Sequence, residues 1–183
     1  MTDDERHAWL MGRKASIGAS DVGGLLGLSD QRWSTPLSVW ESKISDDVDA
    51  TMSGPAAMGI DLEPYMLAEL ARRLEADMYD ASAEPVRHHS APLAANPDGM
   101  IRDPDLEQWI PVEVKFATGD ELSSWGNDPA LGWNMLQSYL KGSGPFPAQT
   151  VIGGYYCQMQ AQILCTGAPY GWLVGVIGAR AGY

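Results

Sequence analysis

The sequence of 183 residues contains only two cysteines and three histidines. A disulfide framework requires several paired cysteines and an iron–sulfur cluster requires about four cysteine ligands, so both are excluded. Cys157 and Cys165 have a spacing that places them two turns apart on one helix, and we expect reduced thiols. His88 and His89 would alternate to opposite faces of a strand with no further ligand at zinc spacing, so we expect structural roles for them.

Long hydrophobic runs are also absent, since no stretch approaches the roughly 20 apolar residues that span a bilayer. This absence argues against a membrane protein. Residues 1–7 are charged and acidic, unlike the start of a secretory signal, so a cytoplasmic location is expected. A chain of this length predicts one domain over residues 1–183.

Basic residues are scarce: Lys and Arg total 12 against 24 Asp and Glu, for a formal net charge of −12. Because phosphate neutralisation requires clustered Lys and Arg, this charge argues against a protein that coats nucleic acid. Acidic residues concentrate in residues 45–49 and 75–84, which can face solvent. Other carboxylates remain available as metal ligands.

Apolar residues recur at helical spacing in several parts of the chain. The clearest case runs from Gly59 to about Asp77, with Glu63 in its first turn. Thr35 and Pro36 are typical of a helix start. The expected helices cover residues 3–14, 35–44, 59–77, 130–141 and 151–165.

Between and after these helices, short β-prone segments are separated by turn residues. Residues 85–89, 99–102 and 109–116 predict a three-stranded meander, with a turn at residues 103–105. Residues 170–177 predict a final strand. The mixture predicts an α/β fold.

Chemistry-bearing residues lie on the expected meander. Because side chains alternate along a strand, Glu113 and Lys115 project from one face. Taken alone, this alternation is also typical of a solvated edge strand, and Asp98 lies in an Asn-Pro-Asp-Gly sequence that is typical of a turn. However, Asp98 starts one strand and precedes Glu113 on the next, which brings two carboxylates and one lysine together.

This set of side chains suits the hydrolysis of a phosphodiester. Asp98 and Glu113 supply oxygen ligands for Mg²⁺ or Mn²⁺, and the backbone carbonyl of Val114 can complete the metal shell. Lys115 would orient or help deprotonate an attacking water and offset the charge that builds on phosphorus. We therefore expect a metal-dependent hydrolase.

Four segments in one order carry a family resemblance. They are Arg13 to Ser20 with a seven-residue step, Gly59-x-x-x-Glu63, Asn96-Pro-Asp98-Gly with Glu113-x-Lys115, and Tyr155-x-x-Gln158-x-Gln160. In this combination the sequence resembles the PD-(D/E)XK nuclease superfamily, and within it the lambda exonuclease and YqaJ-type viral recombinase group. The resemblance covers about residues 9–177 and implies a restriction-endonuclease-like core with a central mixed sheet flanked by helices.

The resemblance also implies roles for further residues. Glu63 would add a carboxylate near the metals, Gln158 would line the site, and Arg13 and Ser20 would contact a 5′-phosphate, with Gln160 as a further DNA contact. Each has a structural alternative: a solvated first-turn acid, ordinary helix polar residues, a surface charge and, for Ser20, a helix N-cap. An arginine beside a hydroxyl at a helix start is nevertheless a sensible phosphate site.

The activity implied is a Mg²⁺-dependent 5′→3′ exonuclease acting on double-stranded DNA ends in recombination. A single-strand annealing protein as partner and a ring-shaped homo-oligomer are implied as well. The alternative is a catalytically inactive relative that binds DNA ends or a protein. Residues 178–183 look like the turn of a hairpin whose second strand is missing, so the family's C-terminal strand and helix are expected to be absent.

Overall fold

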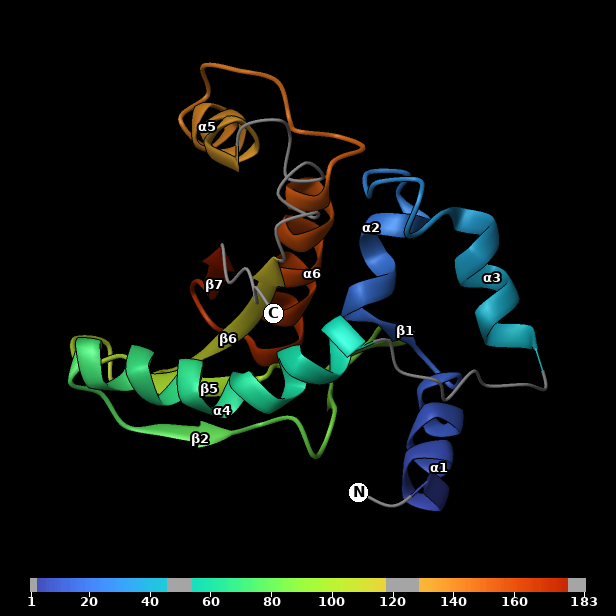
Figure 1. Ribbon diagram of the computed structural model, residues 1–183, viewed down its shortest axis with the longest axis horizontal. Helices are drawn as coiled ribbons and strands as arrows, with labels where there is room; N and C mark the ends of the chain where they lie inside the picture. Colours follow the sequence, from blue (N-terminus) through green and yellow to red (C-terminus); the bar gives the residue numbers. More distant parts are fainter. Residues whose placement is uncertain (1–2, 46–53, 118–128, 178–183) are drawn as a thin grey trace, which may run out of the picture.

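The structure is a computed structural model that describes residues 3–45, 54–117 and 129–177. Two mixed sheets are flanked by helices (Figure 1). The elements in chain order are α1 (Asp3–Arg13), β1 (Ile17–Gly18), the 3₁₀ helix η1 (Ala19–Asp21), α2 (Val22–Leu25), α3 (Pro36–Ile44), α4 (Gly54–Leu74), β2 (Met78–Asp80), β3 (Val86–Arg87), β4 (Leu93–Ala95), β5 (Gly99–Arg102), β6 (Trp109–Ala117), α5 (Pro129–Leu140), α6 (Val151–Thr166) and β7 (Trp172–Ile177).

The larger sheet has the strand order β2-β5-β6-β7. Its first two pairings are antiparallel, and β6 and β7 are parallel. Val112 and Val114 on β6 pack with Leu67 of α4 in a buried cluster. The alternate residue Glu113 faces α6, where it contacts two glutamines. The period of two expected from the sequence is therefore confirmed, and it separates a hydrophobic face from a polar one.

The smaller sheet has the order β1-β4-β3, with β1 and β4 parallel and β3 and β4 antiparallel. Ala19, Ala95 and Ala161 form its buried cluster, so small side chains bring η1, β4 and α6 close together. Helix α6 contacts both sheets and lies between them (Figure 1).

The expected meander is only partly right. Strand β5 pairs with β6 as predicted, but its other neighbour is β2 and not the segment after Pro85. Strand β3 pairs with β4 in the other sheet. Strands β1, β2 and β4 have two or three residues each, too few for an alternating pattern to be recognised.

Helix α4 is longer than expected at its start, since it begins at Gly54 and ends at Leu74. Glu63 is therefore in the helix interior, and its reading as a first-turn acid is wrong. The other four helices agree with expectation to within a few residues. Thr35 caps α3, because its hydroxyl accepts a hydrogen bond from the Ser38 amide at 3.1 Å.

Some surface features differ from the sequence expectation. The rings of His88 and His89 lie against each other with centroids 4.4 Å apart, so the prediction of opposite faces is wrong. The His88 ring accepts backbone hydrogen bonds from Ser90 and Ala91, which is a structural role.

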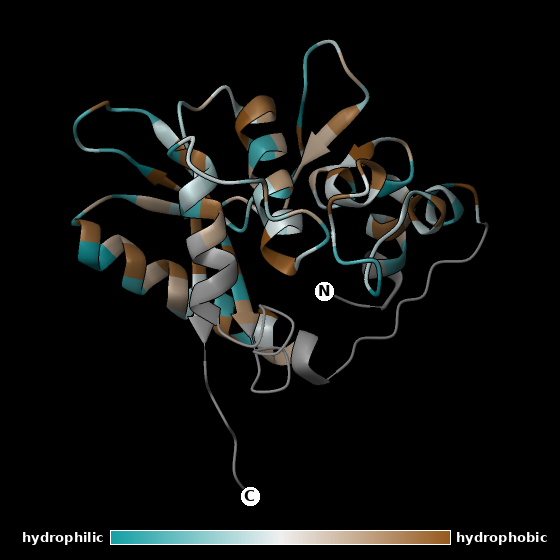
Figure 2. Cartoon of the chain, turned by 90° about the horizontal axis from the view of Figure 1, so that it is seen from above, coloured by the Kyte–Doolittle hydropathy of each residue, from teal (hydrophilic) through white to brown (hydrophobic). Residues whose placement is uncertain are grey.

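Cys157 and Cys165 are free on α6, as expected. Hydrophobic and hydrophilic residues both occur along the helices (Figure 2).

Across the described ranges, no helix is both long and apolar enough to cross a membrane. The acidic segment at residues 45–49 lies almost wholly outside the described residues, and the predicted hairpin turn at 178–183 lies wholly outside them.

Candidate active site

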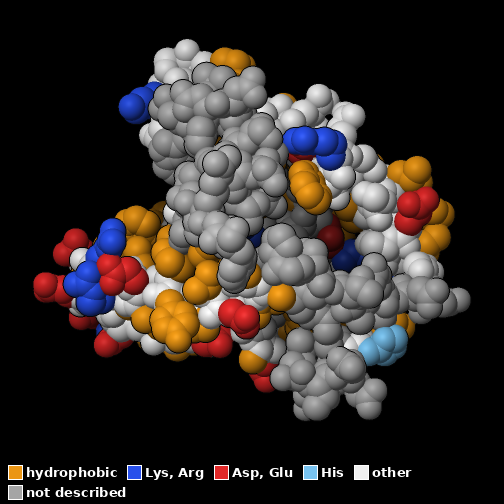
Figure 3. All heavy atoms as spheres, viewed as in Figure 1, with side chains coloured by type: hydrophobic (Ala, Val, Ile, Leu, Met, Phe, Trp, Pro, Cys, Tyr) orange, Lys and Arg blue, Asp and Glu red, His pale blue; other side chains and the backbone are white. Residues whose placement is uncertain are grey.

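A cleft of about 910 Å³ opens between β6, α4, α6 and the segment after α1. Acidic and basic side chains meet in a hollow on the face of the molecule shown in Figure 3. The cleft collects seven of the residues singled out in the sequence: Arg13, Ser20, Glu63, Asp98, Glu113, Lys115 and Gln158. Segments far apart in the chain thus supply one site.

Glu113 is the most buried of these residues, with 2% of its surface exposed. One carboxylate oxygen accepts from the Lys115 ammonium and from the Gln158 amide, the latter at 2.6 Å. The other oxygen accepts from the Gln162 amide. Three donors therefore hold one buried carboxylate, which limits its rotation and supports its charge.

Asp98 lies beside Glu113 at the start of β5. Its backbone N–H donates to the Val112 carbonyl at 3.0 Å, and its carboxylate accepts from the Val114 N–H at 2.7 Å. Burial, together with the charges of Glu113 and Glu63, raises the pKa of Asp98 to about 8. Negative charge is therefore in excess at this point, and Asp98 holds a proton at neutral pH in the absence of a compensating cation.

Lys115 is the cation that contacts the carboxylates, and its side chain is 21% exposed. Burial opposes its charge, yet the charge and hydrogen bond of Glu113, together with Asp98, raise the pKa of Lys115. Its ammonium also lies 5.1 Å from the centroid of the Tyr155 ring. Lys115 is consequently a charged, oriented donor, and not a free base, in this arrangement.

Glu63 reaches the cleft from α4 and is half-buried. Burial and the nearby charges of Glu113 and Asp80 raise the pKa of Glu63, while Lys115 lowers it. Glu63 therefore lines the cleft together with Asp98 and Glu113, and its role near a metal stays a prediction.

Arg13 and Ser20 also line the cleft. The guanidinium donates to the Ser20 hydroxyl at 3.0 Å and lies 4.7 Å from the centroid of the Trp9 ring. Asp21 organises the turn that carries them, because it accepts from the Gly18 N–H at 2.7 Å and pairs with Lys43 at 2.6 Å. Ser20 belongs to η1, so it is not the N-cap of a helix.

The chemistry of the donor set suits a divalent cation. Three carboxylates share the cleft, two of them carry raised pKa values, and oxygen ligands of this kind suit Mg²⁺ or Mn²⁺. Within the described part of the chain, no group of three His, Cys, Asp or Glu side chains converges closely enough to enclose a metal. The Lys115 ammonium contacts one oxygen of Glu113, so a metal at that oxygen would compete with this contact. The proposed carbonyl ligand at Val114 stays a prediction.

The glutamines of α6 differ in their position relative to the cleft. Gln160 is exposed and does not line the cleft, so the structure does not bring it to the other site residues. Gln162, which we did not assign to the site, is fully buried and contacts Glu113. Its spacing of four residues from Gln158 is the signal that places both on one helix face.

Comparison with known structures identifies the class of fold. An alkaline exonuclease from Laribacter hongkongensis, LHK-Exo, has 20% identity and a TM-score of 0.56, covering 98% of this chain and 76% of that chain. LHK-Exo in complex with dAMP gives 19% identity and a TM-score of 0.56, covering 95% of this chain and 74% of that chain. The restriction-endonuclease-like fold, with mixed sheets flanked by helices, is thereby confirmed.

The family follows from the sequence comparison. The family model described as YqaJ-like viral recombinase domain matches residues 8–169. The chain belongs to this family. No curated protein matches the chain. Family and fold together support a nuclease of the recombination type.

Proposed function

We propose that this protein is a metal-dependent exonuclease that degrades double-stranded DNA from its 5′ ends. The observation that carries the proposal is the meeting of Asp98, Glu113, Glu63 and Lys115 in one cleft that also contains Arg13 and Ser20. Carboxylates that face one another with raised pKa values are typical of metal-binding hydrolytic sites.

The carboxylates would hold Mg²⁺ or Mn²⁺. Asp98, Glu113 and Glu63 would be its side-chain ligands, with the carbonyl of Val114 completing the shell. The cation supplies charge for polarising the scissile phosphate and for lowering the pKa of a bound water. Gln158 would hold Glu113 in its orientation through the 2.6 Å hydrogen bond.

Lys115 would act on the attacking water and on the phosphate. Its raised pKa keeps the ammonium charged, so it donates to an oxygen and offsets developing negative charge. Contact with Glu113 and with the Tyr155 ring holds the ammonium in place. A positioned charge of this kind requires little reorganisation when the bond breaks.

Arg13 and Ser20 would bind the 5′-phosphate at the DNA end. A guanidinium and a hydroxyl 3.0 Å apart can both donate to phosphate oxygens. Because this pair and the carboxylates lie in the same cleft, the proposal implies that one terminal nucleotide spans the distance between them. This supports release of nucleotides from a 5′ end.

The overall charge of −12 bears on how DNA would be held. A chain with so few basic residues gains little from phosphate neutralisation outside the cleft. Assembly into a ring around the duplex, and a single-strand annealing protein as partner, are therefore parts of the proposal. The second candidate, an inactive module that binds DNA ends, is disfavoured by the intact Asp98, Glu113 and Lys115.

The proposal is tested by digesting linear duplexes with 5′-phosphate or 5′-hydroxyl ends, and covalently closed circles, with and without Mg²⁺. We expect Mg²⁺-dependent loss of linear duplex, faster with the 5′-phosphate, and intact circles. Lys115→Ala should lower the rate by at least about 100-fold, whereas Lys141→Ala, an exposed lysine near the end of α5, should not.

Degradation of circles would remove the exonuclease assignment. Absence of cleavage with normal Mg²⁺ binding by calorimetry would favour the inactive module. Equal activity of the Lys115→Ala and wild-type proteins would exclude the assigned catalytic site.

A further inference from the structure

A second pocket of about 300 Å³ adjoins the cleft. It lies between the loop that follows α2 and the first turns of α6, and it shares Ser20 and Gln158 with the cleft. A molecule bound in the cleft at Ser20 and Gln158 therefore lies next to this pocket.

The walls of the pocket are held in place by contacts within the protein. The Gln149 N–H donates to the Leu28 carbonyl at 2.8 Å, which fastens the loop to the start of α6. A Cβ added at Gly154 would lie 2.8 Å from the Ser29 hydroxyl, so the loop packs directly against the helix backbone. Because the walls are already ordered, a ligand would not have to organise them.

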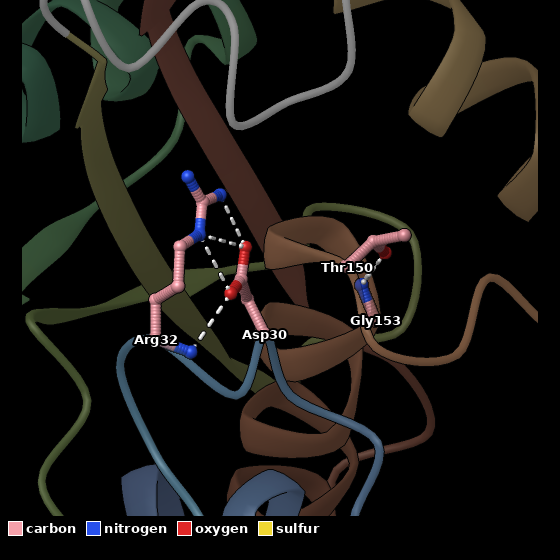
Figure 4. A network of polar contacts seen from close by, with 4 residues as sticks. All are labelled: Asp30, Arg32, Thr150 and Gly153. Atoms are coloured by element: carbon pink, nitrogen blue, oxygen red, sulfur yellow. Dashed lines mark hydrogen bonds and ion pairs between the residues drawn. The ribbon is translucent and has the colours of Figure 1, made fainter.

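Hydrogen bonds also fix the loop itself. The Asp30 carboxylate accepts from the Arg32 side chain at 3.0 Å (Figure 4). The Asp30 backbone carbonyl accepts from the Trp33 N–H at 3.0 Å. On the opposite wall the Thr150 hydroxyl accepts from the Gly153 N–H at 3.0 Å and caps α6 (Figure 4). Trp33 is thereby presented from a rigid turn.

The chemistry of the lining suits an uncharged flat ring. Trp33 and Tyr155 supply aromatic surface, and Ser29 and Ser34 supply hydroxyl groups. Trp33 is 68% exposed although it stands at a concave site. Among the described residues that line this pocket, none is lysine or arginine, and the charge of Asp30 is compensated by its ion pair with Arg32, so the lining offers no excess positive charge to a phosphate. A nucleobase has the required flat face and polar edge.

We propose that this pocket binds the base of the 5′-terminal nucleotide, unpaired from its complement and stacked on Trp33. The inference rests on the proposed function, in which the phosphate of that nucleotide lies at Arg13 and Ser20 and the scissile phosphate lies at the carboxylates. The base of that nucleotide has no place assigned by these contacts, and the pocket shares Ser20 and Gln158 with the cleft, so it is available to the base. A volume of about 300 Å³ is small for a base pair. Stacking on an aromatic ring compensates for the lost pairing.

The experiment combines a protein variant with a substrate variant. A 5′-phosphorylated duplex carries either adenine or an abasic residue at its 5′-terminal position, and binding in Ca²⁺ and cleavage in Mg²⁺ are measured separately. Trp33→Ala should weaken binding of the adenine-ended duplex roughly tenfold or more, and should not change binding of the abasic-ended duplex. Trp33→Phe should retain most of the affinity.

Trp40→Ala is the matched control, because Trp40 is 56% exposed on α3 and does not line the pocket. It should behave as wild type on both duplexes. Thermal unfolding shows whether Trp33→Ala is folded, and its exposed position predicts an unchanged midpoint.

Equal weakening of both duplexes by Trp33→Ala, or no weakening of either, would overturn the base pocket. Cleavage by the wild type without any Trp33-dependent difference would leave the proposed function standing and reject the pocket. Trp33-dependent binding without cleavage would support the pocket and reject the nuclease. No binding of either duplex by the wild type would reject both.

Discussion

The buried carboxylate of Glu113 accepts hydrogen bonds from three donors, and these donors determine whether its charge is available to a cation. A carboxylate removed from water is costly unless donors replace the lost hydration. Lys115, Gln158 and Gln162 replace it, and two of these donors are uncharged. Neutral donors orient the carboxylate without cancelling its charge, so the charge remains available to a cation.

Gln162 is the residue whose loss should show this most clearly. Gln162→Leu removes the donor to Glu113 at nearly constant volume, and also removes a buried carbonyl oxygen that has no hydrogen-bond partner within the described residues. We expect Mg²⁺ affinity to fall about tenfold or more, as is usual when a supporting hydrogen bond is lost. Thermal stability without metal should change little.

Titration calorimetry with Mg²⁺ measures this affinity. Gln160→Leu, two residues earlier on the exposed side of α6, is the control and should keep wild-type affinity. Equal Mg²⁺ affinity in the Gln162→Leu and wild-type proteins would show that Gln162 fills space and does not position Glu113.

At the level of elements, α2 and α6 pack closely because glycines lie where the two helices meet. A Cβ added at Gly23 would lie 3.1 Å from the Cα of Gly154 and directly against the Ser29 hydroxyl. The close approach brings Ser20 and the loop after α2 to the side of α6 that carries Gln158. Glycine is required here by proximity and not by an unusual backbone angle.

Gly23→Ala should therefore destabilise the protein by roughly 1–3 kcal/mol, since backbone must shift to make room. Gly12→Ala is the matched control, because a Cβ at Gly12 would meet nothing within 4 Å. Near the end of α1, that change should stabilise by about 0.5–1 kcal/mol. Urea unfolding of the two variants compares them, and similar midpoints would contradict the packing described for α2 and α6.

At the level of the whole molecule, acidic charge converges on the cleft as well as on the surface. Asp98 keeps its proton up to about pH 8 in the native protein, whereas an unfolded aspartate ionises near pH 4. Between these values the native state binds more protons than the unfolded state. The contribution of Asp98 to the free energy of unfolding is therefore largest below about pH 4 and is lost as the pH rises to about 8.

Without divalent cations, the melting temperature should accordingly fall by at least about 5 °C between pH 5 and pH 8. Asp98→Asn should flatten this dependence, while Asp105→Asn, which changes an exposed carboxylate, should preserve it. Mg²⁺ should raise the melting temperature more at pH 8 than at pH 5, because Asp98 must release its proton before it can act as a ligand. Parallel curves for wild type and Asp98→Asn would contradict the assignment.

Much of the candidate site was predictable because its motifs are local in sequence. Alternation on β6 determines that Glu113 and Lys115 share a face, and helical spacing places Gln158 and Gln162 together. The long amphipathic helices were recognisable for the same reason, since each carries several turns of pattern. Gln162 was missed as a site residue because a buried glutamine and an exposed one look the same in a sequence.

The sequence alone determined the existence of α1, α3, α4, α5 and α6, the strand that carries Glu113 and Lys115, the charge of −12 and the membership of a family. Only the tertiary structure decided that β3 pairs with β4, that β2 completes the larger sheet, and that Glu63 reaches the cleft from the interior of α4. The local spacing of apolar residues in the sequence shows which face of a helix or strand is apolar. Which elements meet depends on close approaches between distant residues, such as Gly23 and Gly154, and such approaches bring Asp98, Glu113 and Lys115 into one cleft with Arg13 and Ser20.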